Sequence, residues 1–187
     1  MEVREAIRER RSLRRYEQKE IPHETMAALL EDAALYASGG NRQPIRFMAV
    51  TEPELREKIF DCIKWAMYLP DFEIAADRHP AGYVVLLAEK PAAVQFDVGA
   101  AATTLMLDAK GFGLDSCCLG ALDRPALKEI LPVPKELEIA LVISLGVGAQ
   151  VCRAVPVRGD VKYYEDGDGN FCVPKYSSEE LTLFTAY

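Results

Sequence analysis

Residues 94–111 read VQFDVGAAATTLMLDAKG, and this stretch decides how the rest of the chain must be arranged. Its apolar residues, among them Val98, Leu105 and Ala109, are spread broadly around a helix. A helix that is apolar on most sides must be covered on most sides. Gly99 and the alanines would let another helix approach closely. The stretch therefore predicts a helix at the centre of a domain or at the seam of a dimer.

Two apolar runs flank this helix in the chain and predict buried strands. Residues 82–89 read GYVVLLAE, and residues 139–146 read IALVISLG. Near-continuous apolar runs of this length are typical of strands that are covered on both faces. A further strand is expected at 46–50. Helical periodicity and capping signals predict helices over 2–11, 22–37, 53–67 and 125–131, and a capping box at 177–180 predicts a last short helix.

Length, charge and cysteine content exclude several classes of function. The 187 residues fit one domain, and a formal net charge of −7 disfavours nonspecific binding to nucleic acid or to an anionic membrane. With no apolar signal region and no apolar run long enough to span a bilayer, the chain is expected to be cytoplasmic. The five cysteines lack C-x-x-C spacing, which fits reduced thiols, and two histidines add little to a metal site. Residues 166–170, DGDGN, lack the glutamate of a calcium loop and predict a hairpin turn.

The charge of the chain reverses locally near its N-terminus. Residues 10–15, here called the arginine segment, read RRSLRR in a protein that is acidic overall. Planar guanidinium groups beside a serine hydroxyl match the oxygens of a phosphate group. A run of charge is also typical of a solvated helix face, so the segment alone leaves both interpretations open.

Polar and aromatic residues after the second expected helix suggest further ligand contacts. Residues 38–44, here called the glycine loop, read SGGNRQP. Its glycines would let backbone amides approach a ligand, although the same composition is typical of an ordinary helix-to-strand connection. Trp65, Tyr68 and Phe72 could roof a flat ligand or pack in the core, and the sequence leaves these two roles open.

Together these stretches resemble the FMN-dependent nitroreductase family. The arginine segment and the glycine loop resemble its N-terminal half, and residues 111–122, GFGLDSCCLGAL, resemble its segment whose backbone amides face flavin N5 and O4. Lys175 resembles its closing basic residue. The chain departs from the family at Ala37, where a proline is usual, at Ile45, where an aromatic residue is usual, and at Tyr176, near which the family commonly has an arginine. The last departure leaves open whether Arg158 helps to bind the phosphate.

The resemblance implies a fold, a cofactor and an activity. The implied fold is α+β, with a mixed or mainly antiparallel sheet of four or five strands enclosed by helices, in an intertwined homodimer with FMN at the subunit interface. The implied activity is that of an FMN-dependent oxidoreductase that passes electrons from NAD(P)H through flavin N5 to a nitroaromatic, a quinone or a similar small acceptor. Reductive dehalogenation or flavin fragmentation on the same fold is an alternative, and a non-enzymatic flavin carrier is an alternative from another class.

The resemblance also implies roles for single residues. Arg10, Ser12 and Lys175 would hold the phosphate, and Arg14, the residue assigned to catalysis, would oppose the negative charge that gathers near flavin N1 and O2. Arg11 could take either role. The partner subunit would supply Asn41 and Gln43. Arg15 is expected to face solvent. The full cofactor-binding set is Arg10, Arg11, Ser12, Arg14, Ser38, Gly39, Asn41, Gln43, Gly120, Ala121 and Lys175.

Overall fold

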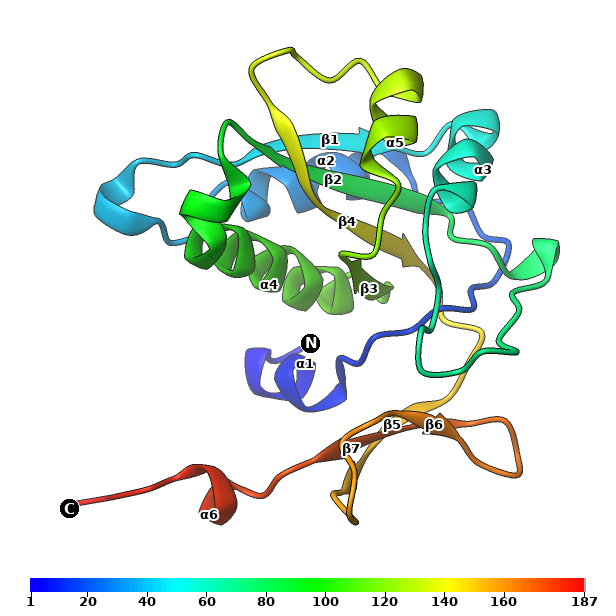
Figure 1. Ribbon diagram of the computed structural model, residues 1–187, viewed down its shortest axis with the longest axis vertical. Helices are drawn as coiled ribbons and strands as arrows, with labels where there is room; N and C mark the ends of the chain where they lie inside the picture. The colour runs from blue at the N-terminus through cyan, green and yellow to red at the C-terminus, as the bar shows by residue number, and fades with distance from the viewer. Residues whose placement is uncertain (187) are drawn as a thin grey trace.

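A four-stranded antiparallel sheet forms the centre of the computed structural model, which describes residues 1–186 (Figure 1). Its strands are β1 (Arg46–Val50), β2 (Gly82–Ala88), β3 (Asp115–Leu119) and β4 (Glu138–Gly146), in the order β1-β2-β4-β3. Every residue of β2 is buried. The two apolar runs therefore form strands, as predicted, and these strands occupy the middle of the sheet, whereas β3 was not predicted as a strand.

Helices cover both faces of this sheet. The core on one face joins the sheet to α2 (His23–Ala33) and α4 (Gln95–Gly111), and the core on the other face joins it to α3 (Pro53–Asp61) and α5 (Arg124–Ile130). Successive side chains of β2 pack in alternate cores. Val84 and Leu86 belong to the first core, and Val85 and Leu87 belong to the second. The arrangement confirms the predicted α+β fold with an enclosed sheet.

One face of α4 remains uncovered within this chain. Leu105 and Ala109 are fully buried, but the side chain of Phe96 is 96% exposed. A Cβ atom placed on Gly99 would meet nothing within 4 Å. The helix α1 (Val3–Glu9) packs against α4 and itself exposes Val3 and Ile7. The apolar character of α4 therefore exceeds what this chain alone buries.

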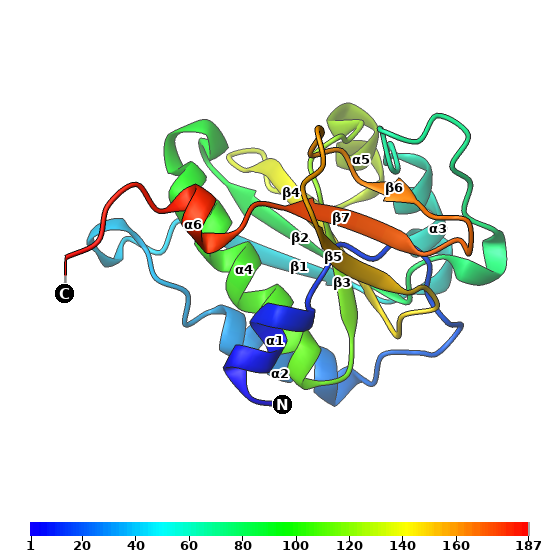
Figure 2. The same ribbon diagram turned by 90° about the horizontal axis from the view of Figure 1, so that it is seen from below.

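A second, smaller sheet follows β4 in the chain. It contains β5 (Cys152–Pro156), β6 (Tyr164–Glu165) and β7 (Phe171–Lys175), with β7 parallel to β5 and antiparallel to β6. The hairpin predicted at the DGDGN turn is confirmed, but the parallel partner β5 was not predicted. The helix α6 (Ser178–Leu181) begins with the predicted capping box, and the chain then extends away from the body (Figure 2).

Two helices end earlier than their periodicity predicted, because tertiary contacts compete with it. Instead of continuing to residue 37, α2 stops at Ala33, and the following turn lets the Tyr36 hydroxyl accept the Ile45 amide at 3.0 Å. Instead of continuing to residue 67, α3 stops at Asp61, and Ile63 then pairs with Leu122. The short helices η1 (Gly39–Asn41), η2 (Ala76–Arg78) and η3 (Pro91–Val94) complete the elements. Among the described residues, none of the helices combines the length and apolar character needed to span a bilayer.

Candidate functional site

The arginine segment runs as an extended chain along the edge of the main sheet. Ser12 pairs with Ser116 of β3 in parallel orientation, and the Leu13 amide donates to the Ser116 carbonyl at 3.0 Å. Further on, Tyr16 pairs with Gly148. Backbone pairing therefore fixes the segment, and its side chains alternate between two faces.

Tyr16 anchors this segment to the core, although nothing in the sequence analysis had marked it as a site residue. Its side chain is fully buried, and its hydroxyl donates to the Leu13 carbonyl at 2.6 Å and lies 2.8 Å from Ser144 Oγ. Burial raises the pKa of Tyr16 well above its ordinary value, so the hydroxyl keeps its proton and remains a donor. A lone aromatic directly after a cationic run is the signal that could have identified it.

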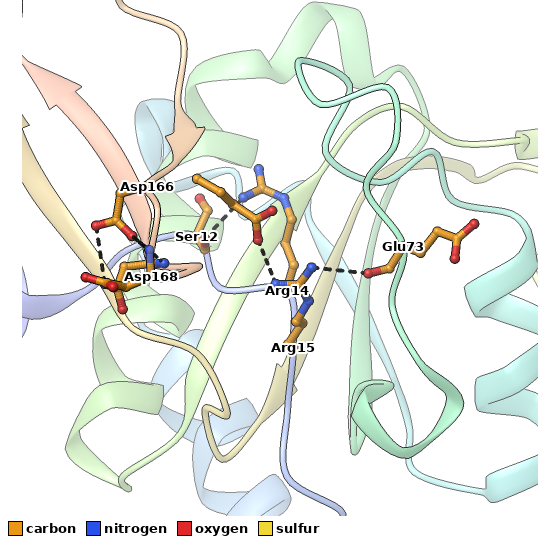
Figure 3. A network of polar contacts seen from close by, with 8 residues as sticks. Ser12, Arg14, Arg15, Glu73, Asp166 and Asp168 are labelled. Atoms are coloured by element: carbon orange, nitrogen blue, oxygen red, sulfur yellow. Dashed lines mark hydrogen bonds and ion pairs between the residues drawn. The ribbon is translucent and has the colours of Figure 1, made fainter.

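Arg14 lies against the rings of Tyr163 and Phe171 and is only 8% exposed. Figure 3 shows its side chain beside Ser12 and Arg15. Its guanidinium carbon lies 4.5 Å from the ring centre of Tyr163 and 5.3 Å from that of Phe171, within the range of cation–π attraction. Its Nη1 donates to the Ser12 carbonyl at 3.3 Å. Its Nε is buried and has no hydrogen-bond partner among the described residues. The residue predicted to be catalytic is therefore preorganised and retains an unused donor.

The prediction that Arg15 faces solvent is wrong. Its Nη1 lies 2.6 Å from Glu165 Oε1, and its Nη2 donates to the Glu73 carbonyl at 3.3 Å (Figure 3). Its guanidinium carbon also lies 4.4 Å from the ring centre of Phe72. The sequence could not indicate this ion pair, because Glu165 lies 150 residues further along the chain and reaches Arg15 through β6.

The three aromatic residues whose role the sequence left open have two different environments. Trp65 stacks on Phe60 at 5.2 Å and packs against the core. Tyr68 lies 5.0 Å from Tyr163, and Phe72 lies 5.4 Å from Phe171, with each distance taken between ring centres. Tyr68 and Phe72 therefore belong to an aromatic cluster over the arginine segment, whereas Trp65 is a core residue.

Gly120 and Ala121 form the turn directly after β3. The Ala121 carbonyl accepts the Lys64 amide at 3.0 Å, which fixes the turn. Gly120 is exposed, and a Cβ atom there would meet only Leu141 Cδ2, at 3.8 Å. Four residues of strand, about 13 Å, separate Gly120 from the position at which Ser12 meets β3. The structure thus places the turn and the arginine segment along the same strand.

The glycine loop has a fixed shape and is attached to the start of α4. The Gly39 amide donates to Oδ1 of the buried Asp97 at 2.7 Å, and Ser38 Oγ accepts the Gln43 amide at 3.1 Å. Asn41 and Gln43 adopt positive φ angles of 54° and 48°, which non-glycine residues rarely do. Backbone strain of this kind is typical of functional loops.

The glycine loop and the arginine segment lie near opposite ends of α4. Asp97 lies at the end of α4 beside the glycine loop. Lys110 lies at the other end of α4, where its Nζ is 2.9 Å from Asp115 Oδ1 at the start of β3. Thirteen residues at 1.5 Å each separate them by about 20 Å. Within one chain, these two predicted FMN-binding regions are too far apart to contact the same phosphate group.

The structure does not bring Lys175 to the arginine segment. Cys152, at the start of β5, has its Sγ 3.8 Å from the Ser12 carbonyl oxygen, but Lys175 pairs with Pro156, about 13 Å further along that strand. Neither a hydrogen bond nor an ion pair joins Lys175 to the segment within residues 1–186. Arg158 lies in the loop after β5, where it pairs with Asp160.

The thiols beside the arginine segment are not activated. Burial raises the pKa of Cys117, although the positive charge of Arg14 opposes this shift. Burial likewise raises the pKa of Cys152 to about 11. Both groups are therefore neutral thiols near pH 7, and the site lacks the thiolate that nucleophilic catalysis by cysteine requires.

Comparison with known proteins relates this architecture to one family. A family model described as "Nitroreductase family" matches residues 7–147, which is more than half of the chain. A protein of Archaeoglobus fulgidus, provisionally named an NADH dehydrogenase/NAD(P)H nitroreductase, is 30% identical over 146 residues, which cover 73% of this chain and 80% of the relative.

Solved structures agree with that match. A nitroreductase from Bacteroides fragilis, solved with bound FMN, is 25% identical and superimposes with a TM-score of 0.66 over 85% of this chain and 96% of its own. An FMN-dependent nitroreductase from Clostridium difficile superimposes with a TM-score of 0.68 at 21% identity, over 97% of this chain and 98% of its own.

Proposed function

Because the chain belongs to the nitroreductase family, we propose that it is an FMN-dependent oxidoreductase. It passes electrons from NAD(P)H through flavin N5 to a nitroaromatic, a quinone or a similar small acceptor. The observation that carries the proposal is the arginine segment, held in extended form along β3 with the exposed Gly120 turn on the same strand. The names of the relatives and the FMN bound to the Bacteroides fragilis protein support it.

An unused donor in the site fits the oxygens of FMN. The Nε atom of Arg14 is buried without a partner among the described residues. A buried donor that lacks an acceptor costs about 1–3 kcal/mol, and an incoming acceptor removes that cost. FMN offers a phosphate dianion and the carbonyl oxygens of its ring, which are acceptors of the required kind.

The residues of the chain would bind, orient and stabilise, and no side chain needs to act as an acid or a base. When bound, FMN supplies the chemistry by accepting a hydride at N5 and passing the electrons on. Arg10 and Ser12 hold the phosphate. Tyr163 covers one face of the Arg14 guanidinium, so the N–H edge of Arg14 is left to approach the ring. A fixed cation there stabilises the negative charge of the reduced ring.

A homodimer completes the site. Asp97, beside the glycine loop, and Lys110, beside the start of β3, lie about 20 Å apart along α4, which supports a glycine loop that acts on the FMN of the partner subunit. The open face of α4 supports this arrangement, since Phe96 and the surface beside Gly99 are exposed and apolar. The exposed apolar residues of α6 and of the segment after it, Leu181, Leu183 and Phe184, would also be covered.

The decisive experiment is an absorption spectrum of freshly purified protein, followed by mass identification of whatever is released on denaturation. We expect flavin absorption, release of FMN, and oxidation of NADH or NADPH on addition of a quinone. A colourless protein that fails to take up added FMN contradicts the proposal. A yellow protein that neither nicotinamide reduces favours a flavin carrier or another electron donor.

Single substitutions separate the roles of two arginines. Arg14→Ala removes the cation near the ring, so we expect a lower flavin reduction potential and slower reduction. Arg10→Ala removes a phosphate contact, so we expect weaker retention of FMN on gel filtration, with reduction of the remaining bound flavin little changed. If both variants keep FMN and turn over normally, these roles are wrong.

A further inference from the structure

A second cationic pocket lies beneath α1, with a volume of about 490 Å³. Four cationic side chains line it, together with the carboxylates of Glu9 and Asp115. Four positive charges against two negative ones leave the lining at +2 in a chain whose net charge is −7. The cations are Arg8, Arg11, Lys110 and Arg153. A local reversal of charge of this kind attracts an anion.

This pocket is distinct from the proposed FMN site, because it uses the other face of the arginine segment. Arg11 and Leu13 line the pocket, whereas Ser12 and Arg14 do not. Alternate side chains of an extended segment point in opposite directions. Arg10, Ser12 and Arg14, which are assigned to the FMN phosphate and ring, therefore belong to the opposite face. Arg11, which the resemblance also placed in the cofactor-binding set, faces this pocket instead.

Unpartnered polar atoms mark the pocket as a place for a ligand. Both amide atoms of the Gln150 side chain, Oε1 and Nε2, are buried without a hydrogen-bond partner in the described part of the chain, as is Arg11 Nε. Buried polar groups in folded proteins are normally paired, and each unpaired group costs about 1–3 kcal/mol. Two of these atoms are donors and one is an acceptor. A ligand that satisfies all three presents acceptor oxygens beside a hydroxyl group.

The cations of the pocket divide into two groups. Lys110 lies 2.9 Å from an Asp115 oxygen and Arg153 lies 2.6 Å from an Asp166 oxygen, so both already have carboxylate partners. Arg8 forms no ion pair within residues 1–186. Arg8 and Arg11 are therefore the cations that remain available for direct contact with an anion.

We propose that this pocket binds the phosphate monoester of a second small molecule, in addition to FMN. A phosphate on a sugar supplies both the anionic oxygens that Arg8 and Arg11 require and a neighbouring hydroxyl for the Gln150 carbonyl oxygen. Two sources offer this chemistry. One is a free sugar phosphate, and the other is the 2′-phosphate of NADPH, which sits on a ribose and is absent from NADH.

The test is a calorimetric titration of the protein, as purified with its flavin, using ribose 5-phosphate as the probe in a low-salt zwitterionic buffer. Arg8→Gln removes a charge-assisted hydrogen bond and should weaken binding at least about tenfold. Arg4→Gln is the matched control, since Arg4 lies one turn away on α1 outside the pocket, and it should change binding less than about twofold. Gln150→Leu should also weaken binding, without lowering the melting temperature, because it removes two unpaired buried atoms.

Steady-state kinetics distinguish the two sources. A rise in KM for NADPH but not for NADH in Arg8→Gln identifies the 2′-phosphate as the ligand. Unchanged KM values with loss of ribose 5-phosphate binding identify a free sugar phosphate. Failure of the wild-type protein to bind either ribose 5-phosphate or NADPH overturns the proposal, as does equal binding by Arg8→Gln and Arg4→Gln. Loss of FMN from Arg8→Gln or Gln150→Leu also overturns it, because the pocket would then be the FMN phosphate site.

The titration does not depend on the flavin. The heat of ribose 5-phosphate binding is measured whether the purified protein is yellow or colourless. A colourless protein that fails to take up added FMN but binds the probe contradicts the proposed function and supports the second site. A yellow protein that NADH reduces, but that binds neither ribose 5-phosphate nor NADPH, supports the proposed function and contradicts the second site.

Discussion

Removing one oxygen atom from Tyr16 should loosen the arginine segment without disturbing the packing around it. Tyr16→Phe leaves the ring in a fully buried position but removes the hydroxyl that donates to the Leu13 carbonyl at 2.6 Å. The same hydroxyl lies 2.8 Å from Ser144 Oγ, which keeps only the more distant Cys117 carbonyl oxygen, at 3.5 Å. The substitution therefore breaks the direct link between the segment and β4.

The expected cost follows from the two groups that lose a partner. A buried neutral hydrogen bond contributes about 1 kcal/mol, and a carbonyl left without a donor raises the loss to about 1–3 kcal/mol. For a chain of this size, each kcal/mol lowers the melting temperature by about 2–4 °C, so we expect a drop of about 2–12 °C. Because Leu13 precedes Arg14, FMN should also dissociate faster.

The measurement is thermal and urea unfolding followed by circular dichroism, at one fixed subunit concentration because a dimer links stability to concentration. Ser144→Ala and the double variant complete a thermodynamic cycle, in which the coupling between Tyr16 and Ser144 should be at least about 0.5 kcal/mol. A melting temperature within 1 °C of wild type, together with additive single effects, would refute the role assigned to Tyr16.

Three further predictions concern packing, charge and the glycine loop. Gly146→Ala would place a Cβ 2.9 Å from Tyr16 Cδ1, so urea unfolding should show a loss of about 1–3 kcal/mol, and an unchanged midpoint would contradict this. Burial and the nearby Asp32 carboxylate raise the pKa of Asp108. The folded protein therefore binds the carboxyl proton of Asp108 more tightly than the unfolded chain does. Its free energy of unfolding falls as pH rises from about 3.9 through the raised pKa. Asp108→Asn should therefore raise the melting temperature at pH 7, and this gain should disappear as pH falls toward about 3.9. A gain that persists at that pH would show that the ionisation of Asp108 is not its cause. Asp97→Ala removes the acceptor that holds the glycine loop and should lower the FMN-to-protein ratio after gel filtration. An unchanged ratio would show that the shape of the glycine loop does not affect FMN binding.

Apolar patterning was sufficient to predict the elements that form the centre of the fold. The runs at 82–89 and 139–146 became β2 and β4, and the stretch at 94–111 became α4, because burial on both faces leaves a pattern in the sequence itself. The strand β3 contains Asp115, Ser116 and two cysteines, which give no such pattern. Its place at the sheet edge, paired with β4 and with the arginine segment, comes from tertiary contacts.

The candidate site was predictable where one short stretch carries the chemistry. The arginine segment was recognisable because its charge reverses that of the chain. The aromatic residues over it were not, because Tyr163 and Phe171 reach Arg14 only through a strand pair that begins more than 140 residues later. The pocket beneath α1 was equally hidden, since Arg8 and Gln150 share no sequence neighbourhood.

The aromatic cover over Arg14 separates the shared part of the site from the part that can vary. The family match ends at residue 147, so Arg14 lies inside it and Tyr163 and Glu165 lie outside it. Exchanging Tyr163 for a smaller or more polar residue would change the dielectric around Arg14, the cation that we propose to lie near the flavin, while leaving every matched residue in place. If Arg14 acts as we propose, the last forty residues therefore give an engineer, or natural variation, a way to adjust the electron affinity of the bound flavin without altering the residues that match the family.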